Sequence, residues 1–123
     1  MCCSGRAEVD ELIVCGWDEV FILDLKREHR QAPAKVWSWK AQDRTDIPVH
    51  SRELFKTTDE CKAIQGGGVL ITSSTNGVAL AERETGNVLF HAVVPNAHSA
   101  ELLPGGRAVV ASSGAEHGNR LVV

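Results

Sequence analysis

The sequence feature that most constrains the fold is an internal repeat with a spacing of 39 residues. Segment 58–74 aligns without a gap with segment 97–113, since 97 minus 58 and 113 minus 74 both give 39. Each copy contains an apolar run, two glycines, a second apolar run and two serines. The identical pairs are Gly66 and Gly105, Gly67 and Gly106, Ser73 and Ser112, and Ser74 and Ser113. Repeats of about 40 residues built from short strands are typical of β-propeller blades.

Short apolar runs separated by turn residues, without a sustained helical period, predict an all-β chain. Strands are expected at 11–15, 20–24, 36–39, 62–65, 69–73, 77–82, 88–93, 100–103 and 107–112. Glycine-rich, Asn-containing and Pro-Gly sequences between these runs have the chemistry of tight turns. The stretch 41–58 is irregular, and Pro48 limits any helix there to one or two turns around 51–56. We interpret that stretch as a connector.

A third, weaker copy of the repeat precedes the other two. Its matches are Ile13 with Ile71, Val36 with Val88, and Trp37 with Leu89. We therefore expect a flexible N-terminal segment over 1–10 and a partial propeller over 11–123, with antiparallel four-stranded blades at about 11–57, 58–96 and 97–123. Closed propellers have about four blades or more, and two and a fraction are incomplete. The expected explanations are a fragment, a ring completed by self-association through an exposed strand edge, or a small open stack of sheets.

Composition excludes several classes of partner. The chain has 13 basic and 16 acidic side chains and a net charge of -3, and it contains no basic run, which argues against nucleic acid. No apolar stretch approaches the ~20 residues of a membrane-spanning helix, so no transmembrane segment is expected. The cysteines and histidines lack the paired spacing of structural zinc sites. We expect no metal and no cofactor.

The N-terminal sequence suggests a location. Cys2 and Cys3, followed by Ser4, Gly5 and a polar stretch, look like the mature start of a bacterial lipoprotein, whose first cysteine carries the lipid. No apolar signal-peptide core precedes them in this chain. Cys2 and Cys3 are therefore candidate lipid anchors, and the expected location is the cell envelope or periplasm. The alternative is two incidental cysteines near the N-terminus.

Two turn motifs resemble known propeller repeats. Residues 82–90, ERETGNVLF, resemble the D-x-x-T-G-K-V-L-W strand and turn of PQQ-type repeats, and residues 103–107, LPGGR, resemble the L-P-D-G-R turn of related bacterial propellers. Segments 14–18, 57–62 and 95–104 are similar to an uncharacterised bacterial family of PQQ-like or WD40-like propellers, often secreted or lipid-anchored. The resemblance covers nearly all of the chain from Glu11 onward and implies a propeller fold. Nothing in the chain corresponds to residues that hold a quinone and its calcium.

The repeat also predicts where a site would lie. In a propeller, the segments that lead into the innermost strands converge on one face beside the central channel. Ionisable groups at such positions are costly unless they are hydrated, paired or used. The alignment pairs Asp59 with His98, Glu60 with Ser99, and Lys62 with Glu101. The candidate ligand-binding residues are Arg44, Asp59, Glu60, Lys62, Asn96, His98 and Glu101. The alternative is a hydrated channel lining with structural charge pairs between blades.

Three functions fit this pattern. The first is a non-catalytic binding module of the bacterial cell envelope that recognises a carbohydrate or a protein through this face. The second is a propeller-fold hydrolase or lyase acting on a polysaccharide-derived substrate, with His98 as general base oriented by Asp59 or Glu101, and with Lys62 or Arg44 stabilising an anionic intermediate. The third is a structural role, in which an exposed edge adds strands.

Other polar and aromatic residues are expected to be structural. Ser112 and Ser113, like the serine pair of the preceding copy, are interpreted as strand ends, and no G-x-S-x-G motif is present. Trp37 and Trp39 could stack on a sugar, but we expect them to pack between blades. His91 is expected at the surface, as are the other histidines apart from His98.

Overall fold

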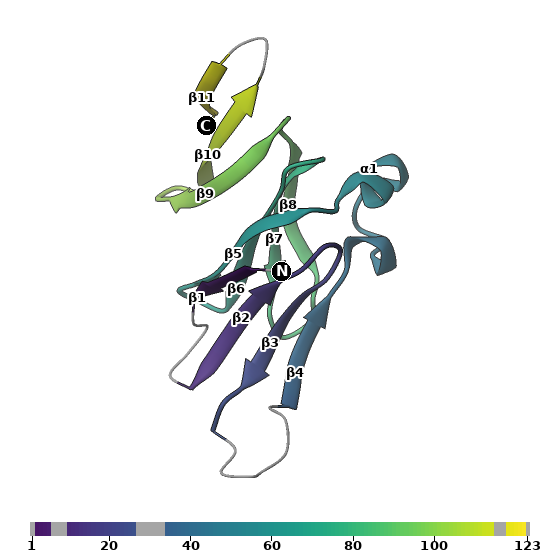
Figure 1. Cartoon of the computed structure of the whole chain (residues 1–123), viewed down its shortest axis with the longest axis vertical. Coiled ribbons are helices and arrows are strands. Elements are labelled where there is room, and N and C mark those ends of the chain that lie inside the picture. The colour runs from purple at the N-terminus through teal and green to yellow at the C-terminus, as the bar shows by residue number, and fades with distance from the viewer. Residues whose placement is uncertain (1, 6–9, 27–33, 115–117, 123) are drawn as a thin grey trace.

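The computed structural model describes residues 2–5, 10–26, 34–114 and 118–122 (Figure 1). Antiparallel strands in these segments form three sheets, each with its strands in chain order. The first sheet contains β1 (Cys2–Gly5), β2 (Glu11–Cys15), β3 (Val20–Asp24) and β4 (Ala34–Trp39). The second contains β5 (Thr58–Ile64), β6 (Gly68–Ser73), β7 (Gly77–Glu82) and β8 (Val88–Val93). The third contains β9 (Ala97–Leu103), β10 (Arg107–Gly114) and β11 (Gly118–Val122).

The predicted all-β class is confirmed, and the predicted strand positions hold closely. Strands β2, β3, β7 and β8 have the predicted boundaries, while β4, β5, β6, β9 and β10 extend beyond them at one end or both. Strand β1 lies within the N-terminal segment, 1–10, for which we predicted no strand, and it pairs with β2. The sequence pattern missed β1 because Cys-Cys-Ser-Gly has neither a β-branched run nor an alternating pattern.

The 39-residue repeat is present in the backbone hydrogen bonds. The N–H of Ser74 donates to the carbonyl of Thr57 at 3.2 Å, and the N–H of Ser113 donates to the carbonyl of Asn96 at 3.1 Å. Thr57 and Asn96 also share a left-handed backbone, with φ of 51° and 53°. The second and third sheets therefore begin with the same local geometry, one repeat apart.

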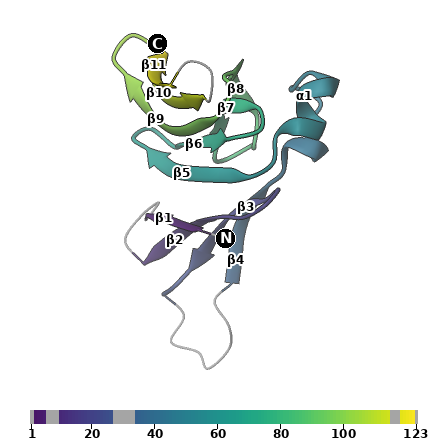
Figure 2. The same ribbon diagram turned by 45° about the horizontal axis from the view of Figure 1, so that its top comes forward.

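The first strands of the three sheets lie next to one another. Strand β5 contacts β1 and β2 on one side and β9 on the other. Figure 2 shows β5 running between the first sheet and the third. The chain therefore stacks its sheets in sequence order, each against the next.

The central strands of the second sheet, β6 and β7, are buried on both faces. Val69 and Ile71 of β6 belong to a core shared with the first sheet, whereas Leu70 between them packs against the third sheet. This arrangement explains why 69–71 is continuously apolar, because a strand covered on both faces has no solvent side that would favour polar residues. The core against the third sheet comprises Leu70, Val78, Leu80, Val94, Ala97, Ala100 and Val110.

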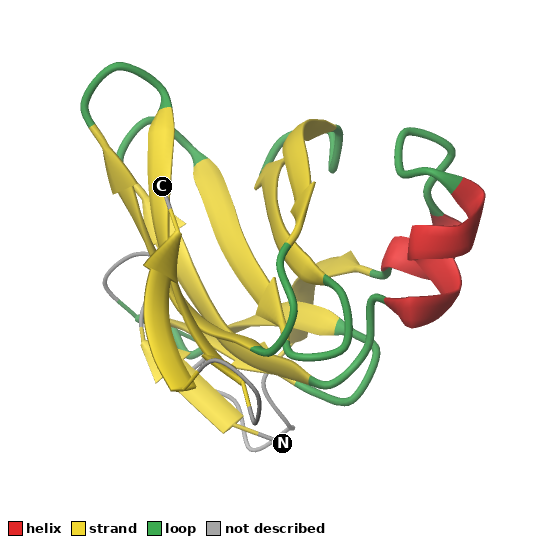
Figure 3. Cartoon of the chain, turned by 90° about the horizontal axis from the view of Figure 1, so that it is seen from above, coloured by secondary structure: helices red, strands yellow, loops and turns green. Residues whose placement is uncertain are grey.

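The connector between β4 and β5 holds the helical residues. A short 3-10 helix, η1 (Ala41–Asp43), precedes helix α1 (Val49–Leu54), and both lie to one side of the sheets (Figure 3). The helix begins directly after Pro48, as expected for a residue with a fixed φ and no N–H to donate. Ile47 and Phe55, on either side of α1, are 1% exposed and anchor the connector to the core. No helix among the described residues has the length and apolar character needed to cross a membrane.

Candidate functional site

Equivalent residues of β5 and β9 contact one another across the two sheets. Asp59 Oδ2 lies 2.7 Å from His98 Nδ1, and Lys62 Nζ lies 2.7 Å from Glu101 Oε1. Ser99 Oγ donates to Glu60 at 3.2 Å. Each of these pairs is separated by 39 positions in the sequence. The structure thus brings together five of the predicted site residues, Asp59, Glu60, Lys62, His98 and Glu101, which we call the β5–β9 cluster.

Irregular strand pairing positions the first pair of this cluster. The β5–β6 ladder shifts register between Thr58 and Glu60, so that Asp59 lies at the irregularity. The β9–β10 ladder shifts at the matching place, opposite His98. Such bulges redirect a side chain relative to a regular strand. Asp59 and His98 therefore face each other because both strands deviate at the same point of the repeat.

His98 uses both of its ring nitrogens. Its Nε2 lies 2.6 Å from Ser113 Oγ on β10, so Asp59, His98 and Ser113 form a continuous chain of hydrogen bonds. Sequence analysis missed Ser113 because the repeat presents it as a strand-end residue with an equivalent in the preceding copy. The only sequence signal was that position 98, near the start of β9, holds histidine where the equivalent position of β5 holds Asp59.

Lys62 is the positive centre of the cluster. Its Nζ lies 3.1 Å from Glu60 Oε1 and 2.7 Å from Glu101 Oε1. Burial lowers the pKa of Lys62, but hydrogen bonds to Glu101 and Glu60 and their charges outweigh burial and leave the pKa raised. Glu60 and Glu101 contact this single ammonium group, and Asp59, which pairs with His98, adds a third carboxylate to the cluster. The cluster is therefore net negative when its carboxylates are ionised.

The structure does not bring Arg44 to this cluster. Arg44 lies in the connector, where its guanidinium binds both carboxylate oxygens of Asp46 at 3.0 and 2.9 Å and also contacts Asn87 Oδ1 at 3.1 Å. The hydrogen bond from Arg44 lowers the pKa of Asp46 to about 2, against an opposing effect of burial and with help from the N–H of Val88. The same pair raises the pKa of Arg44. Arg44 thus ties the connector to the β7–β8 turn.

This ion pair leads to a prediction about acid stability. The pKa of Asp46 is lower in the folded chain than in the unfolded chain. The ionised carboxylate therefore contributes its full stabilisation of the fold above about pH 4, and this stabilisation is lost as the pH falls towards 2. We expect Asp46→Asn to lower the free energy of unfolding by about 1 kcal/mol at pH 7, a value reduced for solvent screening. Urea unfolding at several pH values should show the two proteins converging below pH 3. A difference that stayed constant down to pH 2 would contradict this account.

The remaining predicted residue, Asn96, lies two positions before His98. Its backbone carbonyl accepts the N–H of Ser113, and its positive φ makes it one of the few non-glycine residues with this backbone among those described. Such conformations require support from the surrounding structure. Asn96 therefore turns the chain into β9 beside the Asp59, His98 and Ser113 side chains.

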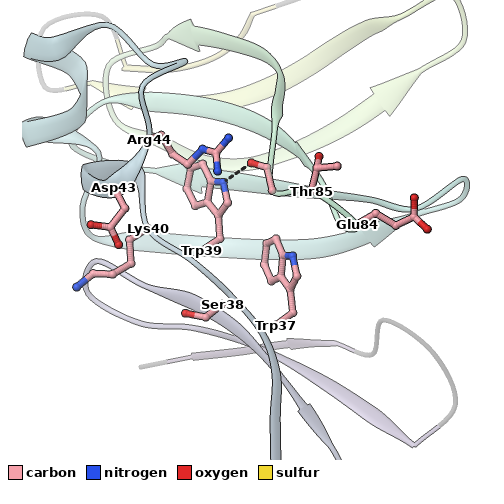
Figure 4. Close-up of a pocket in the computed structure, with 9 residues that line it drawn as sticks. Trp37, Ser38, Trp39, Lys40, Asp43, Arg44, Glu84 and Thr85 are labelled. Carbon is pink, nitrogen blue, oxygen red and sulfur yellow. Dashed lines mark hydrogen bonds between the residues drawn. The ribbon is translucent and has the colours of Figure 1, made fainter.

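A pocket of about 240 Å³ lies between the end of β4, η1 and the β7–β8 turn (Figure 4). Trp39 is buried, and its Nε1 donates to the carbonyl of Gly86 at 3.0 Å. Its side chain packs in the core between the first and second sheets, as we predicted for a tryptophan between successive repeats. Trp37 is half-buried and packs against the same core. The pocket is lined by Trp37, Ser38, Trp39, Lys40, Asp43, Arg44, Glu84, Thr85 and Gly86.

His91, which we expected at the surface, is partly buried and has specific partners within the fold. The ring of His91 lies 6.0 Å from that of Phe55, and its Nε2 lies 2.7 Å from Asn76 Oδ1. Burial lowers the pKa of His91, and the charge of His50 adds to this effect. Phe55 of the connector packs against His91, and sequence analysis could not foresee this contact because the connector shares no pattern with the repeat.

The four cysteines lie in three different strands, β1, β2 and β5. Cys2 and Cys3 lie in β1, opposite Cys15 and Val14, and their side chains are outside the described residues, so their role as lipid anchors stays a prediction. Cys15 is disulfide-bonded, and Cys61 is buried in the core between the first two sheets. Within the described part of the chain, no group of three or more His, Cys, Asp or Glu side chains is arranged to hold a metal ion.

Comparison with known proteins identifies a family without identifying an activity. A model described as "Family of unknown function (DUF6528)" matches residues 21–123, which include most of β3, β4 and all strands of the second and third sheets. No curated protein and no solved structure matches the chain. The matched segment contains the whole β5–β9 cluster and the pocket beside Trp39. The chain belongs to the DUF6528 family, whose function is unknown.

Proposed function

We propose that the chain forms part of a β-propeller that serves as a binding module of the bacterial cell envelope, with a carbohydrate as its ligand. The propeller is supported by three successive antiparallel sheets whose first strands, β1, β5 and β9, lie side by side. Radial repetition of four-stranded sheets around a channel is the architecture of propellers. The first strands would then line the channel, with the β5–β9 cluster among them.

The observation that carries the proposed binding face is the convergence of equivalent repeat positions. Asp59 meets His98 and Lys62 meets Glu101 because the fold stacks one repeat directly on the next. The side chains of His98 and Glu101 are 50% and 67% exposed, so they retain hydrogen-bonding capacity towards solvent. Surface ion pairs of this kind contribute only about 0–1 kcal/mol each, so stability alone is a weak reason for them.

The charge of the cluster indicates the class of ligand. Asp59, Glu60 and Glu101 outnumber Lys62, and an excess of carboxylates disfavours phosphate, sulfate and acidic sugars. Sugar hydroxyls can donate to carboxylates and accept from the lysine ammonium, so a neutral carbohydrate complements both kinds of group. We therefore favour a neutral saccharide as the ligand of this face.

The pocket beside Trp39 favours a carbohydrate over a protein. Its volume of about 240 Å³ is below the ~300–1,000 Å³ of pockets for drug-sized ligands, and this suits a single sugar ring better than a protein surface. The half-buried indole of Trp37 offers an apolar wall for the C–H face of a ring, while Asp43 and Thr85 line the polar edge of the pocket (Figure 4). This pocket would provide a second binding site for a neutral saccharide, in addition to the β5–β9 cluster.

The disulfide supports a location in the envelope. Cys15 is disulfide-bonded, and disulfides persist in oxidising compartments such as the bacterial periplasm. The resemblance to secreted and lipid-anchored propellers points in the same direction. Attachment through Cys2 or Cys3 belongs to this proposal.

An array of neutral glucans, mannans and xylans, with acidic polysaccharides alongside, tests the proposed function. We expect wild-type protein to bind a neutral polysaccharide, and Glu101→Gln to weaken that binding about tenfold or more, since hydrogen bonds to charged groups are worth about 1.5–3 kcal/mol. Glu53→Gln, at an exposed position of α1, is the matched control and should bind like wild type.

Two results would overturn the proposed face. One is the absence of binding to every neutral polysaccharide on the array. The other is normal binding by Glu101→Gln together with its loss in Trp37→Ala, because this result would assign recognition to the pocket and not to the β5–β9 cluster. Calorimetric titration of the bound polysaccharide would give the dissociation constants for this comparison.

A further inference from the structure

We propose that Asp59, His98 and Ser113 form an acyl-ester hydrolase site in which Ser113 is the nucleophile. This inference goes beyond the proposed binding function and does not depend on it. It rests on the order of the three side chains, on the exposure of the histidine and on a comparison between the two repeats.

The three side chains have the arrangement of an activated nucleophile. Ser113 Oγ lies 2.6 Å from His98 Nε2, and His98 Nδ1 lies 2.7 Å from Asp59 Oδ2. A nucleophile and a base within about 2.6–3.2 Å, with a third group orienting the base, is the diagnostic geometry of covalent catalysis by serine. The three residues come from β10, β9 and β5, so two sheets assemble the site.

The hydrogen-bonding capacities of the groups fix the direction of proton transfer. An ionised carboxylate only accepts hydrogen bonds, so the proton between Asp59 and His98 resides on Nδ1. In the neutral ring Nε2 is then the acceptor, and the hydroxyl of Ser113 donates to it. This is the tautomer that a general base needs in order to take the serine proton.

Comparison of the repeats argues that the Ser–His pair is not required for folding. Ser74 stands at the position equivalent to Ser113, and its N–H makes the matching backbone bond to Thr57. Its Oγ donates to the carbonyl of Thr57 at 3.4 Å, and the position equivalent to His98 holds Asp59. The preceding repeat therefore forms the same backbone geometry without a histidine. The pair at His98 and Ser113 is an addition to the shared fold.

The site is accessible to a small substrate. The side chain of His98 is 50% exposed and that of Asp59 is 29% exposed. Ser113 is partly buried on β10. A short acyl group approaching from solvent could reach Ser113 Oγ, and the three side chains that form the site are polar, which offers no apolar contact to a long acyl chain. The substrate class is therefore an ester of a short carboxylic acid, such as an acetyl ester.

The reaction balances with water as the second substrate. Ser113 Oγ attacks the ester carbonyl carbon and its proton passes to His98 Nε2, which then gives the proton to the departing alkoxide as the ester C–O bond breaks. The alcohol leaves and an acyl-serine remains. Water attacks the acyl carbon while His98 accepts its proton, which then returns to Ser113 Oγ as the carboxylic acid is released. Asp59 orients the ring throughout and is a positioning residue.

The test combines covalent labelling with hydrolysis of 4-nitrophenyl acetate by the full chain. A fluorophosphonate should label wild-type protein once, and peptide mapping should find the label on Ser113. Ser113→Ala and His98→Asn should reduce hydrolysis to the background rate and abolish labelling. Ser74→Ala is the matched control, because it removes the equivalent hydroxyl from the other repeat, and it should keep the wild-type rate.

Asp59→Asn separates positioning from a purely structural role. If Asp59 orients His98, this variant should lower kcat by at least about a hundredfold while KM for 4-nitrophenyl acetate changes little, and Asp59→Glu should recover part of the loss. Thermal unfolding of each variant shows that the chain is folded. Labelling elsewhere than on Ser113, the absence of labelling, or wild-type hydrolysis by folded Ser113→Ala would each overturn the proposal.

Discussion

Phe55→Ala is expected to lower the free energy of unfolding by about 3–5 kcal/mol, because it removes a large side chain from a fully packed site. Phe55 is 1% exposed, and its ring meets that of Trp39 edge-on, with centroids 5.7 Å apart and planes at 77°. The substitution would leave a cavity between the connector and the core of the first two sheets. It would also remove the contact that covers His91.

The neighbouring residue offers a matched control for this prediction. Leu54 is 52% exposed, and Leu54→Ala should change the free energy of unfolding by less than about 0.5 kcal/mol. Urea unfolding followed by circular dichroism measures both variants at one pH. Equal effects at the two positions would mean that the connector is not anchored in the core through Phe55.

Gly77→Ala is expected to destabilise the second sheet by about 4 kcal/mol or more, or to prevent folding, which is in the exceptional range for a single substitution. A Cβ on Gly77 would lie 2.0 Å from the carbonyl oxygen of Ala92 and 2.7 Å from the nitrogen of Val94. Both atoms belong to the backbone, so no side-chain rotation relieves the clash. The β7–β8 pairing would have to separate at its first residues, where Gly77 lies opposite Val93.

Gly68→Ala provides the comparison for this substitution. A Cβ at Gly68 would approach the Cδ1 atom of Leu80 at 3.0 Å, and a leucine methyl can move where a carbonyl cannot. We expect its effect to be below about 1 kcal/mol by thermal or urea unfolding. Comparable losses in the two variants would show that β8 can shift away from β7 at little cost, contrary to the close approach described above.

The candidate site was partly predictable from the sequence. The constant spacing of the repeat paired Asp59 with His98 and Lys62 with Glu101, and these pairs are in contact because adjacent sheets stack in register. Arg44 was placed with them by proximity in the sequence. That reasoning failed because the connector turns Arg44 towards Asp46 and Asn87 instead.

The role of Ser113 could not be read from the repeat. An alignment identifies positions that share a backbone geometry, and it matched Ser113 to Ser74 for that reason. Hydrogen bonding between side chains of neighbouring strands depends on bulges and on which residue the next strand presents. The His98–Ser113 contact depends on a bulge, because the β9–β10 register changes beside it, and on β10 presenting a serine there.

The sequence by itself determined the all-β class, nearly all strand positions and the repeat, because alternating apolar patterns, turn residues and β-branched runs act over a few neighbouring residues. Only the tertiary structure decided that β1 completes the first sheet, that β6 and β7 are buried on both faces, and that Phe55 of the connector packs against Trp39 and His91. These outcomes depend on contacts between segments distant in the chain. Local propensity carries no information about which sheet will cover another, and the packing of whole sheets decides it.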